Sequence, residues 1–364
     1  FTEAKLFYVY ISFSSLCSPS ALVHLQEYAF PYQVALLSRP VRLKSAREIS
    51  HLGVYICIET LIDSINSTPW RQKDEKKTLS SNSSSCLSVP EGYEQCPYRG
   101  YVWSILCKVP VYPAHKYERV VSNIQNKLSP EIYQKIKNDT FRTLMNDRAF
   151  HSRVSEDSLM RILAALATTI PENKVGYVQG LNVLLAPIAY TCYKSEPQAF
   201  AILHHLITRQ IPLYITPNLD GVHTALSLVD LVLKIIDPVL SEFLDSKFLK
   251  AEIYAFPSVL TLCACTPPLK SLIKMWDFLF AYGIHMNILF VVAQLIRNRS
   301  TLLKSLQPMK ELRNFPTLDE NNIIKLSLSF IPELPKQLYD MITRHGFDPR
   351  VPEELAAFTK LNKL

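Results

Sequence analysis

Apolar residues recur at helical spacing through most of this chain, and this periodicity limits the fold more than any other feature. The clearest run occupies positions i, i+3, i+4 and i+7 of one helix face: Leu159, Ile162, Leu163 and Leu166. Ser155 before the run suits an N-cap, and Pro171 after it ends the segment. The sequence therefore predicts an amphipathic helix between these two residues.

Similar patterns follow this segment. A helix is expected to open near Tyr177 and to be kinked at Pro187, and Ser195 is expected to cap the next one. Further helices are predicted at residues 222–236, 238–244, 269–282, 285–297, 318–330 and 336–344. The stretch 289–296 is apolar on nearly every side, which indicates a buried central helix. Strand-type alternation is confined to short runs and the chain has only 8 glycines, so the predicted fold class is all-α.

The helical pattern starts near residue 93 and divides the chain into three parts. Residues 1–92 contain apolar runs without clean periodicity, and the serine-rich stretch 79–85 has the composition of a flexible linker. Residues 93–345 are predicted to form one helical domain of roughly 250 residues. Residues 346–364 are predicted to be a C-terminal tail, and the first 92 residues an extension of low order.

Several classes of function are disfavoured by the composition. The chain has neither a P-loop motif nor a G-x-G-x-x-G motif, so it is not expected to bind nucleotide phosphates by itself. Its net charge of +7 comes from scattered basic residues, which does not indicate a nucleic-acid interface. The 8 cysteines have no metal-binding spacing, which predicts no metal site and a reducing, intracellular setting. No apolar run reaches the length of about 18 residues that predicts a transmembrane segment.

Two short segments inside the apolar region carry the candidate chemistry. Arg142 follows Asp139 by three positions, so on a helix the two side chains share a face and could simply pair. Alternatively, Asp139 holds the arginine so that its planar donors point outward. Gln179 lies further along the chain. A guanidinium neutralises charge on a transferring phosphoryl group and a carboxamide orients the attacking water, so this pair suits GTP hydrolysis on another protein.

The residues beside Gln179 allow two interpretations. A glutamine between apolar residues is ordinarily buried and hydrogen-bonded to the backbone. Gly180, however, would let a partner's backbone approach closely where any side chain would obstruct it. Tyr177 would then pack beneath the junction and fix its orientation. Asn182 either braces that junction or points to solvent.

Together the two segments resemble the two-finger signature of the Tre-2/Bub/Cdc16 (TBC) domain family. The residues that carry the resemblance read Ile136-x-x-Asp139-x-x-Arg142-Thr143 and Tyr177-x-Gln179-Gly180-x-Asn182. Further landmarks of the family are matched by Arg99, Trp103, Trp276 and Asp277. The resemblance covers residues 93–345 and implies an all-helical GTPase-activating protein. In it Arg142 would be the arginine finger and Gln179 the glutamine finger, and the other residues would support them or bind the GTPase.

Longer stretches resemble the fungal mitotic-checkpoint members of that family, among them residues 96–103, 133–140 and 276–290. This resemblance implies a small Ras-like GTPase in its GTP form as the partner, from the mitotic-exit or septation-initiation network. It also implies a second subunit of the activating complex, and a place in the cytoplasm and at the spindle pole body. GTP and Mg²⁺ would belong to the GTPase, so no cofactor is expected for the chain itself.

One departure from the family pattern is Leu181, which stands where methionine is usual, an apolar exchange that should be tolerated. On the main hypothesis the chain is an activator that supplies catalytic residues to another enzyme rather than an enzyme itself. Two alternatives stay open. A non-catalytic helical module could bind a GTPase or a scaffold without accelerating hydrolysis, and a structural helical protein could carry Arg142 and Gln179 by coincidence.

Overall fold

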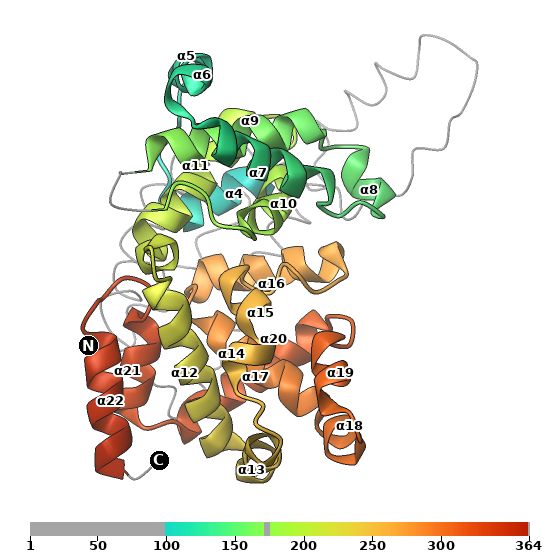
Figure 1. The fold of residues 1–364 in the computed structure, drawn as a ribbon, viewed down its shortest axis with the longest axis vertical. Helices are drawn as coiled ribbons and strands as arrows, with labels where there is room; N and C mark the ends of the chain where they lie inside the picture. Colours follow the sequence, from blue (N-terminus) through green and yellow to red (C-terminus); the bar gives the residue numbers. More distant parts are fainter. Residues whose placement is uncertain (1–98, 171–174, 363–364) are drawn as a thin grey trace, which may run out of the picture.

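Helices joined by turns and loops make up the part of the chain that the structure, a computed structural model, describes (Figure 1). The described residues are 99–170 and 175–362, and they contain no strand. The predicted all-α fold class is therefore confirmed. The predicted extension at residues 1–92 lies outside the described residues, and the division into domains stays a prediction. Within the described ranges, no helix has both the length and the apolar character needed to cross a bilayer.

The helices form an upper and a lower group in Figure 1. The upper group consists of α4 (Arg99–Leu106), α5 (Ala114–Ser122), α6 (Ile124–Lys127), α7 (Pro130–Phe141), α8 (Arg148–His151), α9 (Glu156–Thr169), α10 (Leu181–Thr191) and α11 (Glu196–His205). A short π-helix and a short 3₁₀-helix connect it to the lower group: η4 (Leu206–Gln210) and η5 (Pro212–Ile215).

The lower group begins with the longest helix of the described chain. Its members are α12 (Asp220–Ile236), α13 (Pro238–Ser246), α14 (Ala251–Tyr254), α15 (Phe256–Leu260), α16 (Leu269–Tyr282), α17 (Met286–Arg297), α18 (Arg299–Lys304), α19 (Pro308–Arg313), α20 (Glu320–Phe330), η6 (Ile331–Glu333), α21 (Lys336–Arg344) and α22 (Val351–Asn362). Helix α17 lies at its centre, because it contacts α12, α15, α16, α18 and α20. Every residue from Met286 to Leu295 is buried, which confirms the predicted central helix.

Capping side chains set several helix starts where the sequence places them. Ser155 accepts a hydrogen bond from the backbone N–H of Ser158 at 3.2 Å and begins α9. Ser195 accepts one from the N–H of Gln198 at 3.4 Å and begins α11. Each serine satisfies an amide that the first helical turn leaves without a partner, so both predicted caps are confirmed.

The start of α10 differs from its prediction. The helix begins at Leu181 rather than near Tyr177. Gly180 has a φ of +110°, a left-handed conformation that cannot belong to a right-handed helix. Residues 177–180 therefore form a turn in front of the helix, and Pro187 lies inside the helix as expected.

The end of the chain is more ordered than the predicted C-terminal tail at residues 346–364 suggests. This segment contains α22, whose Val351, Leu355 and Phe358 are buried against the rest of the fold. The spacing of these three residues, i, i+4 and i+7, gives the helix one apolar face. The helical body therefore continues beyond residue 345.

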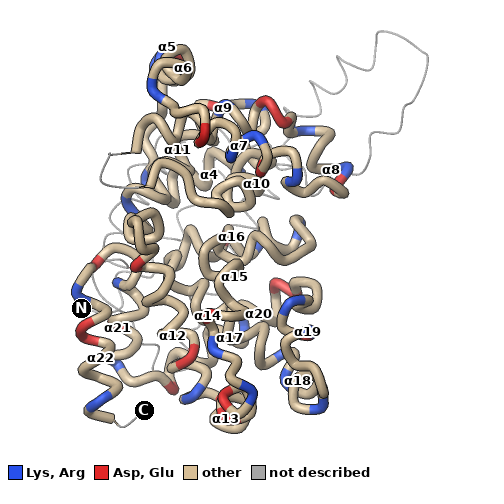
Figure 2. The backbone as a smooth tube through the Cα atoms, viewed as in Figure 1, with Lys and Arg blue, Asp and Glu red and all other residues tan. Residues whose placement is uncertain are grey.

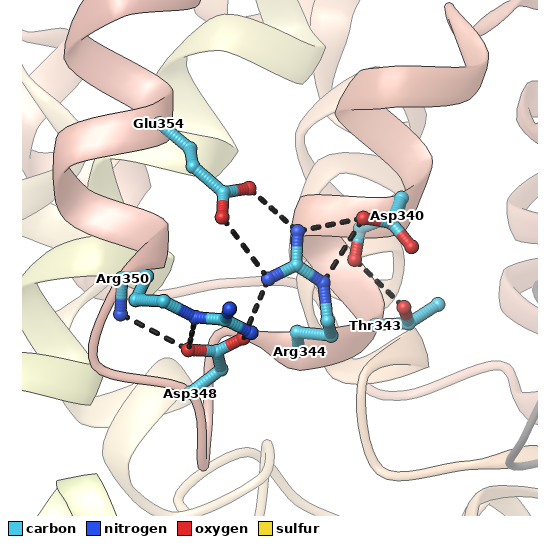
Figure 3. A network of polar contacts seen from close by, with 6 residues as sticks. All are labelled: Asp340, Thr343, Arg344, Asp348, Arg350 and Glu354. Atoms are coloured by element: carbon cyan, nitrogen blue, oxygen red, sulfur yellow. Dashed lines mark hydrogen bonds and ion pairs between the residues drawn. The ribbon is translucent and has the colours of Figure 1, made fainter.

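A polar cluster joins α21 to α22 (Figure 3). Arg344, at the end of α21, lies 2.6 Å from a carboxylate oxygen of each of Asp340, Asp348 and Glu354. Arg350 adds a further ion pair to Asp348 at 2.7 Å. These guanidinium groups, Arg350 first and Arg344 second, hold the pKa of Asp348 well below its usual range. The cluster fixes the direction in which the chain enters α22.

His345 directly follows Arg344 and is buried, with contacts to α21 and to the 3₁₀-helix η5. Its Nδ1 lies 2.7 Å from the carbonyl oxygen of Ile342, and its Nε2 lies 2.9 Å from the hydroxyl of Tyr214 in η5. A neutral ring fits these contacts, because Nδ1–H can donate to the carbonyl while Nε2 accepts from the tyrosine. Burial lowers the pKa of His345 to about 4.

The folded protein should lose stability as the pH falls from about 6.5 to about 4, in part because of His345. In that window the unfolded chain binds a proton at this ring and the folded chain does not, so the free energy of unfolding decreases with falling pH. A His345→Gln variant should reduce this slope by up to about 1.4 kcal/mol per pH unit in urea titrations. Gln125→Ala, at an exposed residue that carries no titratable group, supplies the control and should leave the slope unchanged. An unaltered slope in His345→Gln would contradict the assignment.

Candidate functional site

Helix α7 presents Arg142 at its C-terminal end. The helix begins with Ser129, whose hydroxyl accepts from the N–H of Ile132 at 3.3 Å, followed by Pro130 in the first turn. It ends at Phe141, so Arg142 is the first residue after the helix. The Arg142 side chain is 55% exposed and pairs with Asp139 one turn earlier. The guanidinium is therefore held at one edge and open to solvent elsewhere.

Asp139 is buried and is the centre of the site. One carboxylate oxygen pairs with Arg142, and the other accepts a hydrogen bond from the Tyr177 hydroxyl at 2.7 Å. Its backbone oxygen accepts from the hydroxyl of Thr143 at 2.8 Å and from the amide of Asn182 at 3.1 Å. This single residue of α7 thus contacts both predicted finger segments.

Tyr177 is buried beneath the second segment, as the sequence predicts. Burial raises the pKa of its hydroxyl far above the usual value, and the hydrogen bond to the Asp139 carboxylate adds to this effect. The hydroxyl therefore keeps its proton and stays a donor to Asp139. Because that carboxylate also pairs with Arg142, Tyr177 connects the turn at residues 177–180 to the arginine.

Asn182 braces the same junction with both ends of its amide. Its Nδ2 donates to Thr143 Oγ1 at 2.9 Å as well as to Asp139, and its Oδ1 accepts from the Gly180 N–H at 3.2 Å. Of the two options the sequence left open for Asn182, the structure shows the bracing one. The amide is buried, so these bonds replace its contacts with water.

The backbone conformation of Gly180 requires glycine. Its positive φ is unfavourable for residues with a side chain, and a Cβ here would lie 3.0 Å from the Leu260 side chain. The predicted close approach of a partner's backbone stays a prediction. Gln179, just before it, is exposed and makes no hydrogen bond to the described residues, so it is not the buried glutamine of the ordinary interpretation. Its carboxamide is available to a binding partner.

A second set of predicted site residues lies in the core. Asp277 of α16 accepts hydrogen bonds from Arg99 Nε at 3.1 Å and Trp103 Nε1 at 2.6 Å, both from α4. Trp276 Nε1 donates to the carbonyl oxygen of Leu262 at 2.9 Å. All of these side chains are buried, as is Ile136 of α7. Their burial and these contacts give them a structural place in the core, and the expectation that any of them binds a GTPase stays a prediction.

Exposed apolar side chains around Arg142 were not singled out in the sequence. Phe141 and Met145 flank the arginine on either side, and Tyr133 lies two turns earlier on α7. The helical periodicity of residues 130–141 could have identified Phe141 as an exposed side chain. The buried face of α7 passes through Ile136 and Thr140, and Phe141 lies off that face. An exposed arginine with exposed apolar residues next to it in the chain suits contact with another protein.

Within the described ranges, no three His, Cys, Asp or Glu side chains lie close enough together to hold a metal ion.

The family model described as the Rab-GTPase-TBC domain matches residues 96–303 of the chain.

Two curated proteins show strong similarity to this chain. It is 44% identical to the mitotic check point protein BUB2 of Saccharomyces cerevisiae, over 73% of this chain and 89% of that protein. It is 46% identical to cell division control protein 16 of Schizosaccharomyces pombe, over 69% of this chain and 81% of that protein.

The fold is also found among solved structures. The Ypt/Rab-GAP domain of Gyp1p superposes with a TM-score of 0.54 at 22% identity, covering 65% of this chain and 87% of that one. The Chlamydomonas flagellar RabGAP TBC domain gives a TM-score of 0.51 at 18% identity, covering 86% of this chain and 99% of that one. At these identities the likeness concerns the fold.

The hydroxyl of Tyr177 should contribute measurably to stability. A Tyr177→Phe variant leaves one oxygen of the buried Asp139 carboxylate without its donor, so the free energy of unfolding should fall by about 1–3 kcal/mol in urea titrations. Tyr133→Phe is the matched control, because Tyr133 is exposed on α7, the helix that carries Asp139, and its loss of a hydroxyl should change stability by less than about 0.5 kcal/mol. Equal stabilities for the two variants would show that the Tyr177–Asp139 hydrogen bond contributes little to the free energy of unfolding.

Proposed function

Because the chain belongs to the Rab-GTPase-TBC domain family, we propose that it activates a small GTPase by supplying Arg142 and Gln179 to the nucleotide site of that GTPase. The chain then acts in trans on another enzyme, and GTP and Mg²⁺ are bound by the partner. The observation that supports this most is the shared attachment of both finger segments to Asp139, with the two side chains left at the surface.

Arg142 is suited to the charge that develops during hydrolysis. Water attacks the γ-phosphorus, the bond to the β-phosphate oxygen breaks, and negative charge spreads over the oxygens of the transferring group. A guanidinium stays protonated at any relevant pH and presents several donors in one plane. Asp139 occupies one edge of the Arg142 guanidinium through Nη2, so the remaining N–H groups can face the phosphate.

Gln179 is suited to orient the attacking water. A carboxamide carries one acceptor and two donor positions, which lets it bind the water and a phosphate oxygen together. The turn that carries Gln179 is fixed on one side by Tyr177 and on the other by the Asn182 bond to Gly180. Ordering of the turn before binding reduces the entropy lost when the complex forms.

We further propose that the partner is a Ras-like GTPase of the mitotic-exit or septation-initiation network, bound in its GTP form. The names of the two curated relatives, a mitotic check point protein and a cell division control protein, favour this partner over a membrane-traffic GTPase. The same similarity motivates two finer proposals: a second subunit in the activating complex and a location at the spindle pole body.

Loss of the arginine should abolish most of the stimulation. Arg142→Ala should lower the stimulated single-turnover rate of GTP hydrolysis by a factor of about 10³ or more, because an arginine finger supplied in trans typically contributes about 10³ to 10⁵. Binding of the GTP-loaded partner should change little. The matched control is Arg148→Ala, which removes another exposed arginine from the adjacent helix α8. An Arg142→Ala protein that stimulates as well as the parent would overturn the arginine-finger mechanism, whereas a parent chain that binds the GTPase without stimulating hydrolysis would favour the non-catalytic binding module.

The glutamine should matter for the chemical step and not for folding. Gln179→Ala removes an exposed side chain without hydrogen bonds to the described residues, so the unfolding free energy should change by less than about 0.5 kcal/mol. The stimulated rate should nevertheless fall at least about tenfold across a panel of purified Ras-like and Rab GTPases. Gln125→Ala, at an exposed glutamine of α6, is the control. If both variants keep the parental rate, Gln179 does not orient the water.

A further inference from the structure

A surface hollow of about 640 Å³ lies in the lower helix group, between the end of α13 and helix α19. Its apolar lining includes Leu249, Pro308 and Met309. Figure 1 shows α13, α18 and α19 in the lower helix group, with α19 above α18 at the right, and α7 in the upper group. This α13–α19 hollow is therefore remote from Arg142 and does not belong to the proposed catalytic site.

Phe248 stands in the chain between Lys247 and Leu249, which line the hollow, and it occupies a backbone position that favours glycine. Helix α13 ends in a Schellman motif, in which the N–H of Phe248 donates to Asp245 O at 2.9 Å and the N–H of Leu249 donates to Leu244 O at 3.0 Å. The motif requires a left-handed residue at its centre, and Phe248 has a φ of +56°. An aromatic residue in this conformation costs stability that glycine would not.

The packing of Phe248 does not offset this cost. Its side chain is 86% exposed. The other non-glycine residues with positive φ in the described chain are buried or partly buried, and they are Lys108, Leu144, Leu219, Leu262 and Cys263. Phe248 combines a strained backbone with an exposed aromatic ring. This combination indicates that the ring contacts another molecule rather than the rest of this chain.

Leu306 is a second exposed apolar side chain at the same hollow. It is 97% exposed and directly precedes Gln307 and Pro308, which both line the hollow. Phe248 likewise stands between two lining residues, Lys247 and Leu249. Two exposed apolar residues from separate parts of the chain are therefore next in sequence to residues that line the hollow.

The cations of the hollow lack acidic partners. Lys247, Lys310 and Arg313 line it, are exposed, and form no ion pair with the described residues. The neighbouring Asp245 pairs instead with Lys250 at 2.6 Å, and neither of these two lines the hollow. Lys and Arg positions along α18 and α19 and beside α13 are marked in Figure 2. The lining thus combines exposed basic side chains with less exposed apolar ones.

From these features we infer that the α13–α19 hollow binds an acidic peptide segment of a partner protein, anchored by an apolar side chain. The acidic groups would pair with Lys247, Lys310 and Arg313, and the anchor would enter the hollow between Phe248 and Leu306. A membrane surface shares the same charge and apolar character, but it is flat and would leave a concave space of this size unfilled. The position opposite α7 leaves the arginine free for a GTPase at the same time.

A displayed library of random short peptides, selected against the full chain, tests this inference. Selection should enrich sequences with several Asp or Glu around an apolar residue, and their affinity should fall with rising salt. The double variant Lys310→Glu/Arg313→Glu should weaken them at least about tenfold. Val111→Ser, which removes an exposed apolar side chain between α4 and α5, should have no effect. Failure to enrich acidic sequences, or binding unaffected by the double variant, would overturn the inference.

Two substitutions at Phe248 separate binding from folding. Phe248→Ala removes the ring but keeps the strained position, so peptide affinity should fall about tenfold without a gain in stability. Phe248→Gly should lose the same affinity and also raise the urea midpoint, because glycine relieves the strain. A lower midpoint in both variants would show that the ring is structural. Binding to phosphatidylserine vesicles that needs Phe248, without peptide binding, would assign the hollow to a membrane instead.

Discussion

The carboxylate of Asp139 is the group on which the proposed site depends. It joins Arg142 to Tyr177, and its own backbone oxygen receives Thr143 and Asn182. A buried carboxylate without partners would be unfavourable, whereas this one is shared between a guanidinium and a neutral hydroxyl. The two finger segments are therefore ordered relative to each other before any GTPase arrives. Electrostatic catalysis benefits from such order, because groups already in place need not reorganise during the reaction.

The chain contains a second arginine–carboxylate pair with an aromatic donor, and the comparison shows how burial decides the role. Arg99 and Trp103 contact Asp277 just as Arg142 and Tyr177 contact Asp139. The guanidinium of Arg99 is buried, so its charge serves to join α4 to α16. The guanidinium of Arg142 has only one edge covered and can offer its charge to another molecule. The same residue types thus support the fold in one place and, in the proposed mechanism, would supply a catalytic charge in the other.

Much of the fold could be predicted from the sequence because helices are local. Apolar spacing and caps such as Ser155 depend on neighbours within a few turns. The start of α10 was misplaced because a glycine signals either a special φ or a close contact, and only coordinates show that Gly180 is left-handed. Helix α22 was missed for a related reason. Its apolar face is visible in the sequence, but its order depends on distant packing and on the contacts of Arg344.

The departures from local rules are informative because they fall into two kinds. At Gly180 the chain has glycine, the residue that the left-handed backbone requires. Glycine there avoids strain and also permits the turn that carries Gln179. At Phe248 the chain uses a residue that the backbone disfavours, and the ring it displays contributes little packing to the described fold. Sequences that specify one structure are consistent across levels except where function demands otherwise. The ordered contacts around Asp139 near α7 and the strained, exposed Phe248 after α13 lie in the upper and lower helix groups (Figure 1). Two different partners could therefore contact the two helix groups at the same time.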